Sequence, residues 1–262
     1  MGFATMAAAT RSIDLNSDLG EGYGPYSISD DAAMLSLVTS ANIACGGHAS
    51  DPETMYRTLT LARERGVVVG AHPGYPDREN FGRRDLPYKP AEIARFTAAQ
   101  IGALTAMAKL AGTEVRYVKP HGALNNRACD DAEISEAIIA AVEAIDRNLA
   151  ILAISGTELE IAARRRGLPV YSEVFADRGY TPTGRLVPRG TPGDLIHDEA
   201  AAATRLLGFL DSGRMPTVGG SPVALAVHSI CIHGDNPGAV RIARALRGAL
   251  EANGMALRPF LT

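Results

Sequence analysis

The sequence predicts a closed barrel of parallel β-strands surrounded by α-helices. Short β-rich runs alternate with longer helical patterns through the 262 residues, which is typical of βα units around a parallel sheet. Right-handed crossover connections then leave two architectures, an open doubly wound sheet or a barrel. An open sheet gathers its functional groups at one switch point, whereas a barrel presents them at the ends of many strands. Because nearly every strand candidate here ends in polar residues, we predict the barrel.

The first strand candidate, Ser12–Asn16, has two different faces. Ile13 and Leu15 form an apolar face, while Asp14 and Asn16 form a polar face that would point toward the barrel axis. A strand of a parallel sheet is normally apolar on both faces, so this polar face is a candidate functional surface. The other strand candidates are Val38–Ala44, Val67–His72, Val115–Lys119, Ala150–Ser155, Val170–Ala176 and Val223–Cys231.

Helical patterns lie between these strands and carry their own start and stop signals. Asp51 precedes a proline at the first helical position, and Gly66, Gly112 and Gly167 each end a helical pattern just before a strand. No repeat or proline-rich linker divides the chain, so we predict one domain over residues 13–262 after a disordered extension over residues 1–12. The expected helices are Asp51–Arg65, Pro90–Ala111, Asp130–Arg147, Thr157–Arg166, Asp198–Ser212 and Pro237–Asn253.

The composition excludes several classes of protein. A net charge of -3 gives no reason to expect a nucleic acid or an anionic membrane as partner. No apolar run approaches the ~20 residues of a membrane helix. The cysteines Cys45, Cys129 and Cys231 are odd in number and far apart, which argues against a disulfide framework and for a reducing cytoplasm. The absence of a CxxC pair argues against a thiolate zinc site.

Histidines follow several of the predicted strands at their carboxyl ends, where barrel active sites form. A single histidine at a strand end more often forms a structural hydrogen bond in a loop than takes part in catalysis. Several histidines that converge at one end of a barrel predict a functional site. Imidazole titrates near neutrality, so these side chains can move protons or hold a divalent metal. His197 is predicted to cap a helix and His228 to lie in the core. The four strand-end histidines are His48, His72, His121 and His233.

Carboxylates at the same strand ends supply general bases or metal ligands. Mixtures of aspartate and histidine suit hydrolytic zinc, manganese or magnesium sites. The sequence has no HExxH motif, so whether a metal is bound stays open. The carboxylates are Asp14, Asp18, Glu21, Glu173, Asp177 and Asp235. If a metal is bound, its predicted ligands come from Asp14, Asp18, His48, His72 and His121.

Three cations are candidates for binding an anion. Lys119 shares the strand parity of Tyr117, so it would be a buried ammonium that must be paired. It is either in a structural ion pair with Asp14 or Glu173, or a clamp for a carboxylate or an oxyanion. Arg83 and Arg178 lie in loops and could bind a carboxylate or phosphate. For Arg83, the sequence is equally consistent with a solvated residue on the surface. The sequence contains neither GxxxxGK[ST] nor GxGxxG, so it has no recognised phosphate loop.

Seven motifs in order along the chain resemble the LamB/YcsF family, which comprises the A subunits of bacterial 5-oxoprolinases. Two positions depart from the family pattern: Ser50 stands where glycine is common, which is a conservative loop change, and Asn125 stands where tyrosine is common. The motifs are DLNSDLGEGYG at Asp14–Gly24, SANIACGGHASDP at Ser40–Pro52, GAHPGYPD at Gly70–Asp77, FGRR at Phe81–Arg84, KPHGAL at Lys119–Leu124, EVFADRGY at Glu173–Tyr180 and HGDNPGAV at His233–Val240.

The resemblance implies a fold, a reaction and partners. The fold would be a seven-stranded β/α barrel, TIM-barrel-like and of the glycoside hydrolase/deacetylase type. The reaction would be the ATP-dependent opening of 5-oxo-L-proline to L-glutamate, with Mg²⁺ accompanying ATP. The chain would work with two further subunits, B and C. Two alternatives stay open: a stand-alone metal-dependent hydrolase of a carbohydrate or N-acyl substrate, and a non-catalytic protein that presents a ligand to its partners.

The implied chemistry requires a base for water, a cation near the developing oxyanion and an anchor for the ring carboxylate. Our hypothesis assigns Lys119 as the cation and Arg83 or Arg178 as the anchor. The base and its orienting group would come from Asp14, Asp18, His48 and His121. Further substrate contacts are expected from Asn16, Asn42, His72, Glu173, Asp177, His233 and Asp235.

Overall fold

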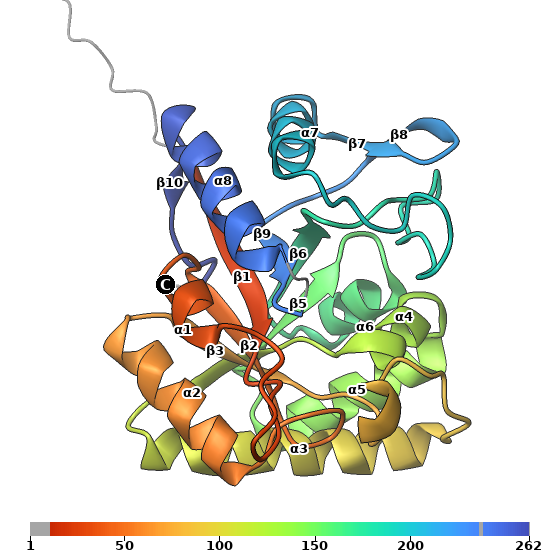
Figure 1. Cartoon of the computed structure of the whole chain (residues 1–262). Helices are drawn as coiled ribbons and strands as arrows, with labels where there is room; N and C mark the ends of the chain where they lie inside the picture. Colours follow the sequence, from red (N-terminus) through yellow and green to blue (C-terminus); the bar gives the residue numbers. More distant parts are fainter. Residues whose placement is uncertain (1–10, 236–237, 262) are drawn as a thin grey trace, which may run out of the picture.

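The structure, a computed structural model, describes residues 11–235 and 238–261. These residues form a closed barrel of seven parallel strands (Figure 1), because β9 pairs with both β6 and β1. The predicted barrel is therefore confirmed. Its strands are β1 (Ser12–Leu19), β2 (Ser40–Ala44), β3 (Val68–His72), β4 (Val115–Val118), β5 (Ala150–Ile154), β6 (Val170–Phe175) and β9 (Ser229–His233).

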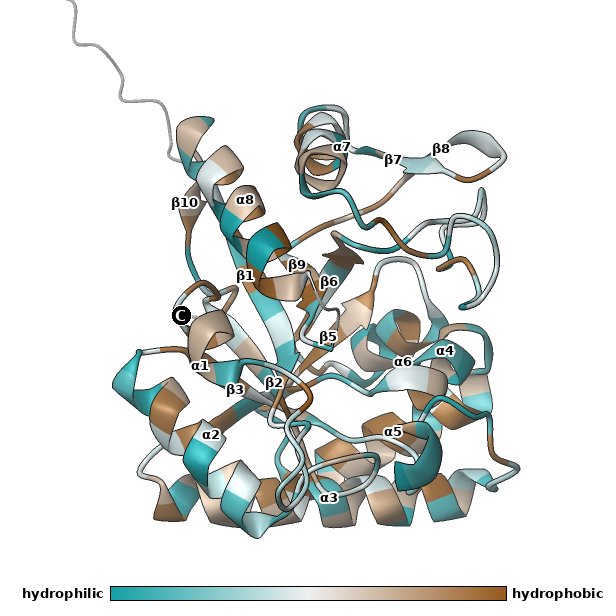
Figure 2. Cartoon of the chain, viewed as in Figure 1, coloured by the Kyte–Doolittle hydropathy of each residue, from teal (hydrophilic) through white to brown (hydrophobic). Residues whose placement is uncertain are grey.

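The helices pack around the outside of the barrel and carry both apolar and hydrophilic residues (Figure 2). Helix α2 shows why they form. Asp51 accepts the Thr54 N–H at 2.9 Å, and the buried Met55 and Leu59 are spaced four residues apart on one face. The helices are α1 (Asp31–Leu35), α2 (Pro52–Glu64), α3 (Pro90–Leu110), α4 (Gly122–Asp130), α5 (Ala132–Ile145), α6 (Glu158–Arg166), α7 (Glu199–Ser212) and α8 (Ala239–Ala252), with a 3₁₀ turn at Arg78–Asn80. Among the described helices, none has the length and hydropathy that crossing a membrane would require.

The prediction of one strand over Val223–Cys231 is wrong. Its first residues belong to β8 (Gly220–Ala224), which pairs antiparallel with β7 (Arg214–Thr217) outside the barrel, and the barrel strand begins only at Ser229. An apolar run does not show where pairing with one partner ends and pairing with another begins. His228 lies between β8 and β9 and is exposed, whereas the sequence predicted that it would lie in the core. Its Nδ1 accepts the Ser172 N–H at 2.9 Å.

Three smaller differences concern the ends of elements. The predicted helix Asp130–Arg147 begins only at Ala132, where Asp131 is the N-cap, and α4 precedes it. The exposed His197 does not cap α7, because that cap is Asp198, which accepts the Ala201 N–H. The predicted N-terminal extension lies outside the described residues over residues 1–10, while Ser12 is already the first residue of β1.

The amino-terminal end of the barrel is closed by the last residues of the described chain. Strand β10 (Ala256–Leu257) pairs with the start of β1 and leads to Phe260. The Phe260 ring lies 5.0 Å from the Tyr117 ring and 4.9 Å from the Tyr171 ring. Access to the barrel axis is therefore left at the carboxyl ends of the strands, as in other barrels.

Asp14 lies at this closed end and is buried among hydroxyl groups. Thr39 and Ser40 each donate a hydrogen bond to its Oδ1 at 2.6 Å, and Ser229 donates to its Oδ2. Burial raises the pKa of Asp14 to about 6, although the three hydroxyl groups act to lower it. The prediction that Asp14 contributes to the mouth of the barrel is therefore not supported by its position.

The raised pKa of Asp14 predicts a pH-dependent stability. The folded chain holds the Asp14 proton more tightly than the unfolded chain, whose pKa is near 3.8. This contribution to the free energy of unfolding is fully present below pH 3.8 and is lost as the pH rises through 6. The loss amounts to about 3 kcal/mol. Urea unfolding of Asp14→Asn between pH 4 and 7 should show a correspondingly weaker pH dependence, and equal slopes for the two proteins would contradict the assignment.

Candidate active site at the barrel mouth

A cavity of about 370 Å³ opens at the carboxyl ends of the barrel strands. Asp18 from β1, His72 from β3 and Lys119, which follows β4, reach it from the barrel. The long loop between β6 and α7 and the start of α4 form its wall. The remaining lining residues are Arg83, Pro120, His121, Gly122, Ala123, Asn125, Asn126, Phe175, Arg178, Leu186, Pro188, Arg189 and His233.

Lys119 is a buried ammonium held by two carboxylates. Its Nζ lies 2.9 Å from Asp18 Oδ1 and 3.2 Å from Glu173 Oε2. Nζ also lies 3.0 Å from the sulfur of Cys231. The expected pair with Glu173 is confirmed, whereas Asp14 belongs to the other end of the barrel and the nearest carboxylate is Asp18.

The ion pair sets the protonation of its members. Burial alone would lower the pKa of Lys119, but Asp18 and Glu173 raise it well above its usual value. Burial would raise the pKa of Asp18, but His72 and Lys119 hold it well below its usual range. Burial and the Asp18 charge raise the pKa of Glu173 to about 7, against the effect of Lys119. Lys119 and Asp18 are therefore ionised at neutral pH, and Glu173 titrates there.

Asn16 and Asn42 lie beneath the cavity and do not line it. The Asn42 side-chain NH₂ donates to Asp18 Oδ1 at 2.8 Å and to Asn16 Oδ1 at 2.7 Å. The Tyr117 hydroxyl donates to Asn42 Oδ1 at 2.6 Å. Glu173 is likewise fully buried below the cavity. These residues orient Asp18 and Lys119, so the structure does not support the direct substrate contacts predicted for Asn16, Asn42 and Glu173.

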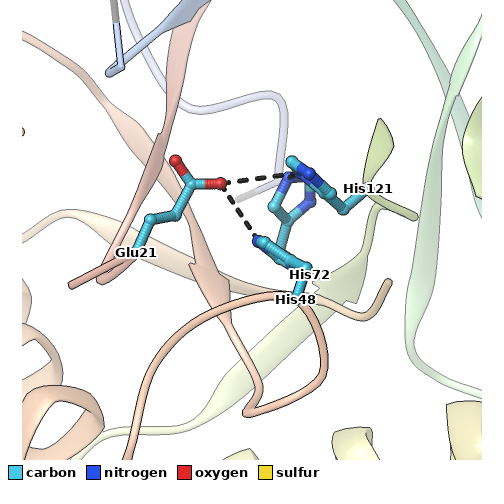
Figure 3. Close-up of side chains that lie close together, drawn as sticks. All are labelled: Glu21, His48, His72 and His121. Atoms are coloured by element: carbon cyan, nitrogen blue, oxygen red, sulfur yellow. Dashed lines mark hydrogen bonds and ion pairs between the residues drawn. The ribbon is translucent and has the colours of Figure 1, made fainter. Parts of the chain in front are cut away.

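Three histidines and Glu21 converge beside the cavity (Figure 3). His72 Nδ1 donates to the Lys119 carbonyl at 2.7 Å, and His121 Nε2 donates to the Phe81 carbonyl at 2.8 Å. The inner nitrogens, His72 Nε2 and His121 Nδ1, lie 3.0 Å apart. Burial and the neighbouring imidazoles lower the pKa of His121 well below its usual value.

His48 stacks on His121 and faces the Glu21 carboxylate. The two imidazole centroids are 3.6 Å apart at an interplanar angle of 5°. His48 Nε2 lies 3.1 Å from Glu21 Oε1, and Figure 3 shows this contact as a dashed line. A Cβ at Gly74 would lie 2.8 Å from His48 Nδ1, and one at Gly82 would lie 2.7 Å from His48 Cβ. Only glycine at these two positions leaves room for the stacked rings.

Glu21, rather than Asp14 or Asp18, is the carboxylate that lies among the three histidines. It is buried, and burial together with the charges of Asp18 and Asp235 raises its pKa well above the usual range. The sequence shows Glu21 as a carboxylate in the glycine-rich turn after β1. Its spacing alone could not show whether Glu21 or Asp18 would lie beside the histidines. Asp18 Oδ2 lies 3.4 Å from His72 Nε2, at the edge of this group.

The predicted residues after β6 and β9 form one wall of the cavity. Asp177 is buried and both of its carboxylate oxygens lie 3.1 Å from His233 Nδ1. Burial would raise the pKa of Asp177, but His233 and Arg178 lower it. Arg178 donates to the carbonyls of Asp194 and Val187, which orders the loop over the site. Asp177 therefore positions His233, and Arg178 positions the loop.

The rim of the cavity carries arginines. Arg83 pairs with Asp235 at 2.6 Å. Arg189, which was not among the predicted site residues, lies on the same rim. Burial and the nearby Arg83 cation lower the pKa of Arg189, and burial and Arg189 lower the pKa of Arg178. An anion bound among these cations would relieve their mutual repulsion.

The two departures from the family pattern have different consequences. Ser50 is buried with a φ of 78°, the left-handed region that favours glycine, and its hydroxyl has no hydrogen-bond partner among the described residues. The substitution is therefore not conservative for the backbone. Asn125 lines the cavity, and its Oδ1 is buried with no partner in the described part of the chain. This oxygen can accept a hydrogen bond from a bound ligand.

Comparison with known proteins extends the similarity beyond the motifs. The LamB/YcsF family model matches residues 13–262. The A subunit of a 5-oxoprolinase from Gluconobacter oxydans is 49% identical over 248 residues, which cover 95% of this chain and 98% of that protein. The corresponding protein of Paracidovorax citrulli is 51% identical over 248 residues, which cover 95% of this chain and 99% of that protein. The crystal structure of a lactam utilization protein from Thermus thermophilus superposes with a TM-score of 0.89 at 42% identity, covering 94% of this chain and 99% of that chain.

Proposed function

The chain belongs to the LamB/YcsF family, and from this premise we propose that it is the A subunit of a 5-oxoprolinase that opens 5-oxo-L-proline to L-glutamate. The observation that carries the proposal is the cavity at the barrel mouth, where a buried lysine–aspartate pair faces a rim of arginines. A five-membered lactam with one carboxylate presents complementary groups: a carbonyl that becomes an oxyanion, an N–H donor and a permanent negative charge.

The rim supplies the anchor for the substrate carboxylate. Arg189 has a guanidinium that the described hydrogen bonds do not engage, and Arg178 retains one unused nitrogen after its two loop contacts. A carboxylate held by such guanidinium groups is bound with fixed orientation. We assign the lactam N–H to the Oδ1 of Asn125.

Lys119 and Asp18 supply the chemistry at the carbonyl. The Lys119 ammonium is preorganised by its carboxylate partners, so it stabilises the oxyanion without moving. Asp18 is ionised and orients the attacking water, which adds its oxygen to the carbonyl carbon. The ring C–N bond then breaks, and its nitrogen takes up the proton that the water gives up.

ATP and partner proteins complete the proposal. The lactam is resonance-stabilised, so transfer of the terminal phosphoryl group from ATP, with Mg²⁺, to the amide oxygen would activate the carbonyl carbon for water and release ADP. Opening of the ring then leaves an acyl phosphate, which a second water hydrolyses to glutamate and phosphate. The chain has no recognised phosphate loop, so we assign nucleotide binding to the partner subunits B and C.

The test is glutamate release from 5-oxo-L-proline. The purified chain is assayed with and without subunits B and C, and with and without MgATP. Glutamate only in the presence of both partners and ATP is the expected result. No glutamate under any condition, with partners shown to be folded, would overturn the proposal.

The same assay separates the other two functions. A stand-alone hydrolase, which the cluster of histidines and Glu21 favours, would act on N-acyl or carbohydrate substrates without ATP. A protein that only presents its ligand would keep full activity in the complex after replacement of His48, His72 and His121.

A further inference from the structure

Two histidine nitrogens face each other, and in the neutral rings neither of them carries a proton. His72 Nδ1 carries the proton that it donates to the Lys119 carbonyl, so its Nε2 has only a lone pair in the neutral ring. His121 Nε2 carries the proton that it donates to the Phe81 carbonyl, so its Nδ1 also has only a lone pair. These two acceptors lie 3.0 Å apart, where they cannot hydrogen-bond to each other. Such an arrangement requires a cation between or beside them.

The Glu21 carboxylate and the His48 imidazole lie beside these two nitrogens. Glu21 Oε1 lies 3.5 Å from His121 Nδ1 and 3.1 Å from His48 Nε2. One donor atom from each of the four residues lies within 4.8 Å of the other three. Metal–nitrogen bonds of 2.0–2.1 Å set neighbouring ligands about 3.3 Å apart in a tetrahedral zinc site. The contacts of 3.0, 3.1 and 3.5 Å match this spacing, and a bound ion would draw the more distant donor pairs closer together.

We propose that Glu21, His48, His72 and His121 bind one divalent transition-metal ion. The outer N–H groups of His72 and His121 are held by backbone carbonyls, which is how proteins fix the tautomer of a metal-bound histidine. Three imidazole nitrogens and one carboxylate oxygen suit zinc, cobalt, nickel or iron rather than magnesium or calcium. Asp18 lies outside this group of four donors: Lys119 and Asn42 engage its Oδ1, and its Oδ2 approaches only His72 Nε2, at 3.4 Å.

The site is placed to act on the same ligand as Lys119. His72 and His121 line the cavity, whereas Glu21 and His48 do not. A bound ion would supply Lewis-acid polarisation of a carbonyl or an activated water at this wall. The metal-site proposal does not require that the lactam is the substrate, because ion binding can be measured without turnover.

The experiment measures binding by the full chain after removal of metal with a chelator. Titration with Co²⁺ should give the visible absorption bands of a cobalt–imidazole site, and Zn²⁺ should displace Co²⁺ and abolish these bands. Calorimetric titration with Zn²⁺ should give one ion per chain with a Kd of about 1 µM or tighter. Saturating Zn²⁺ should also raise the Tm.

The variants identify the ligands. His72→Ala and His121→Ala should each weaken Zn²⁺ binding at least about 100-fold. Glu21→Gln keeps the size of the side chain and should weaken it as well, which covers the case in which a histidine variant fails to fold. His197→Ala, at an exposed position, and His233→Ala, which lines the cavity but is not one of the four grouped residues, are the controls and should bind Zn²⁺ as the native chain does.

Two results would overturn the proposal. One is a native chain that binds neither Co²⁺ nor Zn²⁺, which would mean that a proton is the shared cation. The other is binding that persists unchanged in folded His72→Ala and Glu21→Gln variants. Glutamate release that fails while Zn²⁺ still binds would overturn the proposed reaction and leave the metal site standing.

Discussion

Replacing Lys119 with methionine is expected to reduce glutamate release in the complete 5-oxoprolinase by about 10³-fold or more. Methionine keeps approximately the length of the side chain but removes the ammonium that we propose to stabilise the oxyanion, and loss of a single oxyanion donor alone costs about 10²–10³-fold. It also leaves Asp18 and Glu173 facing each other without their shared cation. The measurement is the steady-state rate with subunits B and C and MgATP.

The matched control is Lys109→Met, which replaces an exposed lysine near the end of α3 and should keep full activity. A second readout distinguishes an electrostatic role for Lys119 from a space-filling one. Because Lys119 lowers the pKa of Glu173, its loss should move that pKa upward from about 7. A folded Lys119→Met protein that keeps native activity and an unshifted Glu173 would contradict the assignment.

Replacing Gly70 with alanine is expected to destabilise the barrel by about 3 kcal/mol or more. A Cβ at Gly70 in β3 would lie 2.2 Å from a ring carbon of Tyr117, far inside contact distance. The Tyr117 ring cannot move aside freely, because it is fully buried and its hydroxyl donates to Asn42. Overpacking of a buried site typically costs about 1–3 kcal/mol, and here a polar contact is strained as well. The measurement is thermal or urea unfolding.

Gly102→Ala is the control for this prediction. Gly102 lies in the interior of α3, where an added Cβ meets nothing within 4 Å. Alanine there should stabilise the chain by about 0.5–1 kcal/mol, because glycine is the poorer helix former. A Gly70→Ala protein as stable as the native chain would show that the Tyr117 ring has freedom that the structure does not suggest.

Local patterns were enough to predict the barrel and most of its strands. Alternation along β1, stop signals before strands and polar residues after them are all properties of neighbouring residues, which parallel βα units require. The histidines at the mouth followed from the same logic, since the carboxyl ends of barrel strands converge. The pattern failed at Val223–Cys231, because two consecutive strands with different partners can share one apolar stretch.

Only the tertiary structure decided which polar residue reaches the cavity. Asp14 and Asp18 share one face of β1, but the strand rises about 3.3 Å per residue, so four residues place them about 13 Å apart along the strand. Asp14 is thereby left among hydroxyls at the closed end, and Asp18 meets Lys119 at the open end. Glu21 enters the histidine group because the turn after β1 folds its side chain toward His48 and His121. The sequence by itself determined the types of functional group and the end of the barrel where most gather. Their pairing, depth and charge depend on contacts between distant segments, which no local spacing specifies.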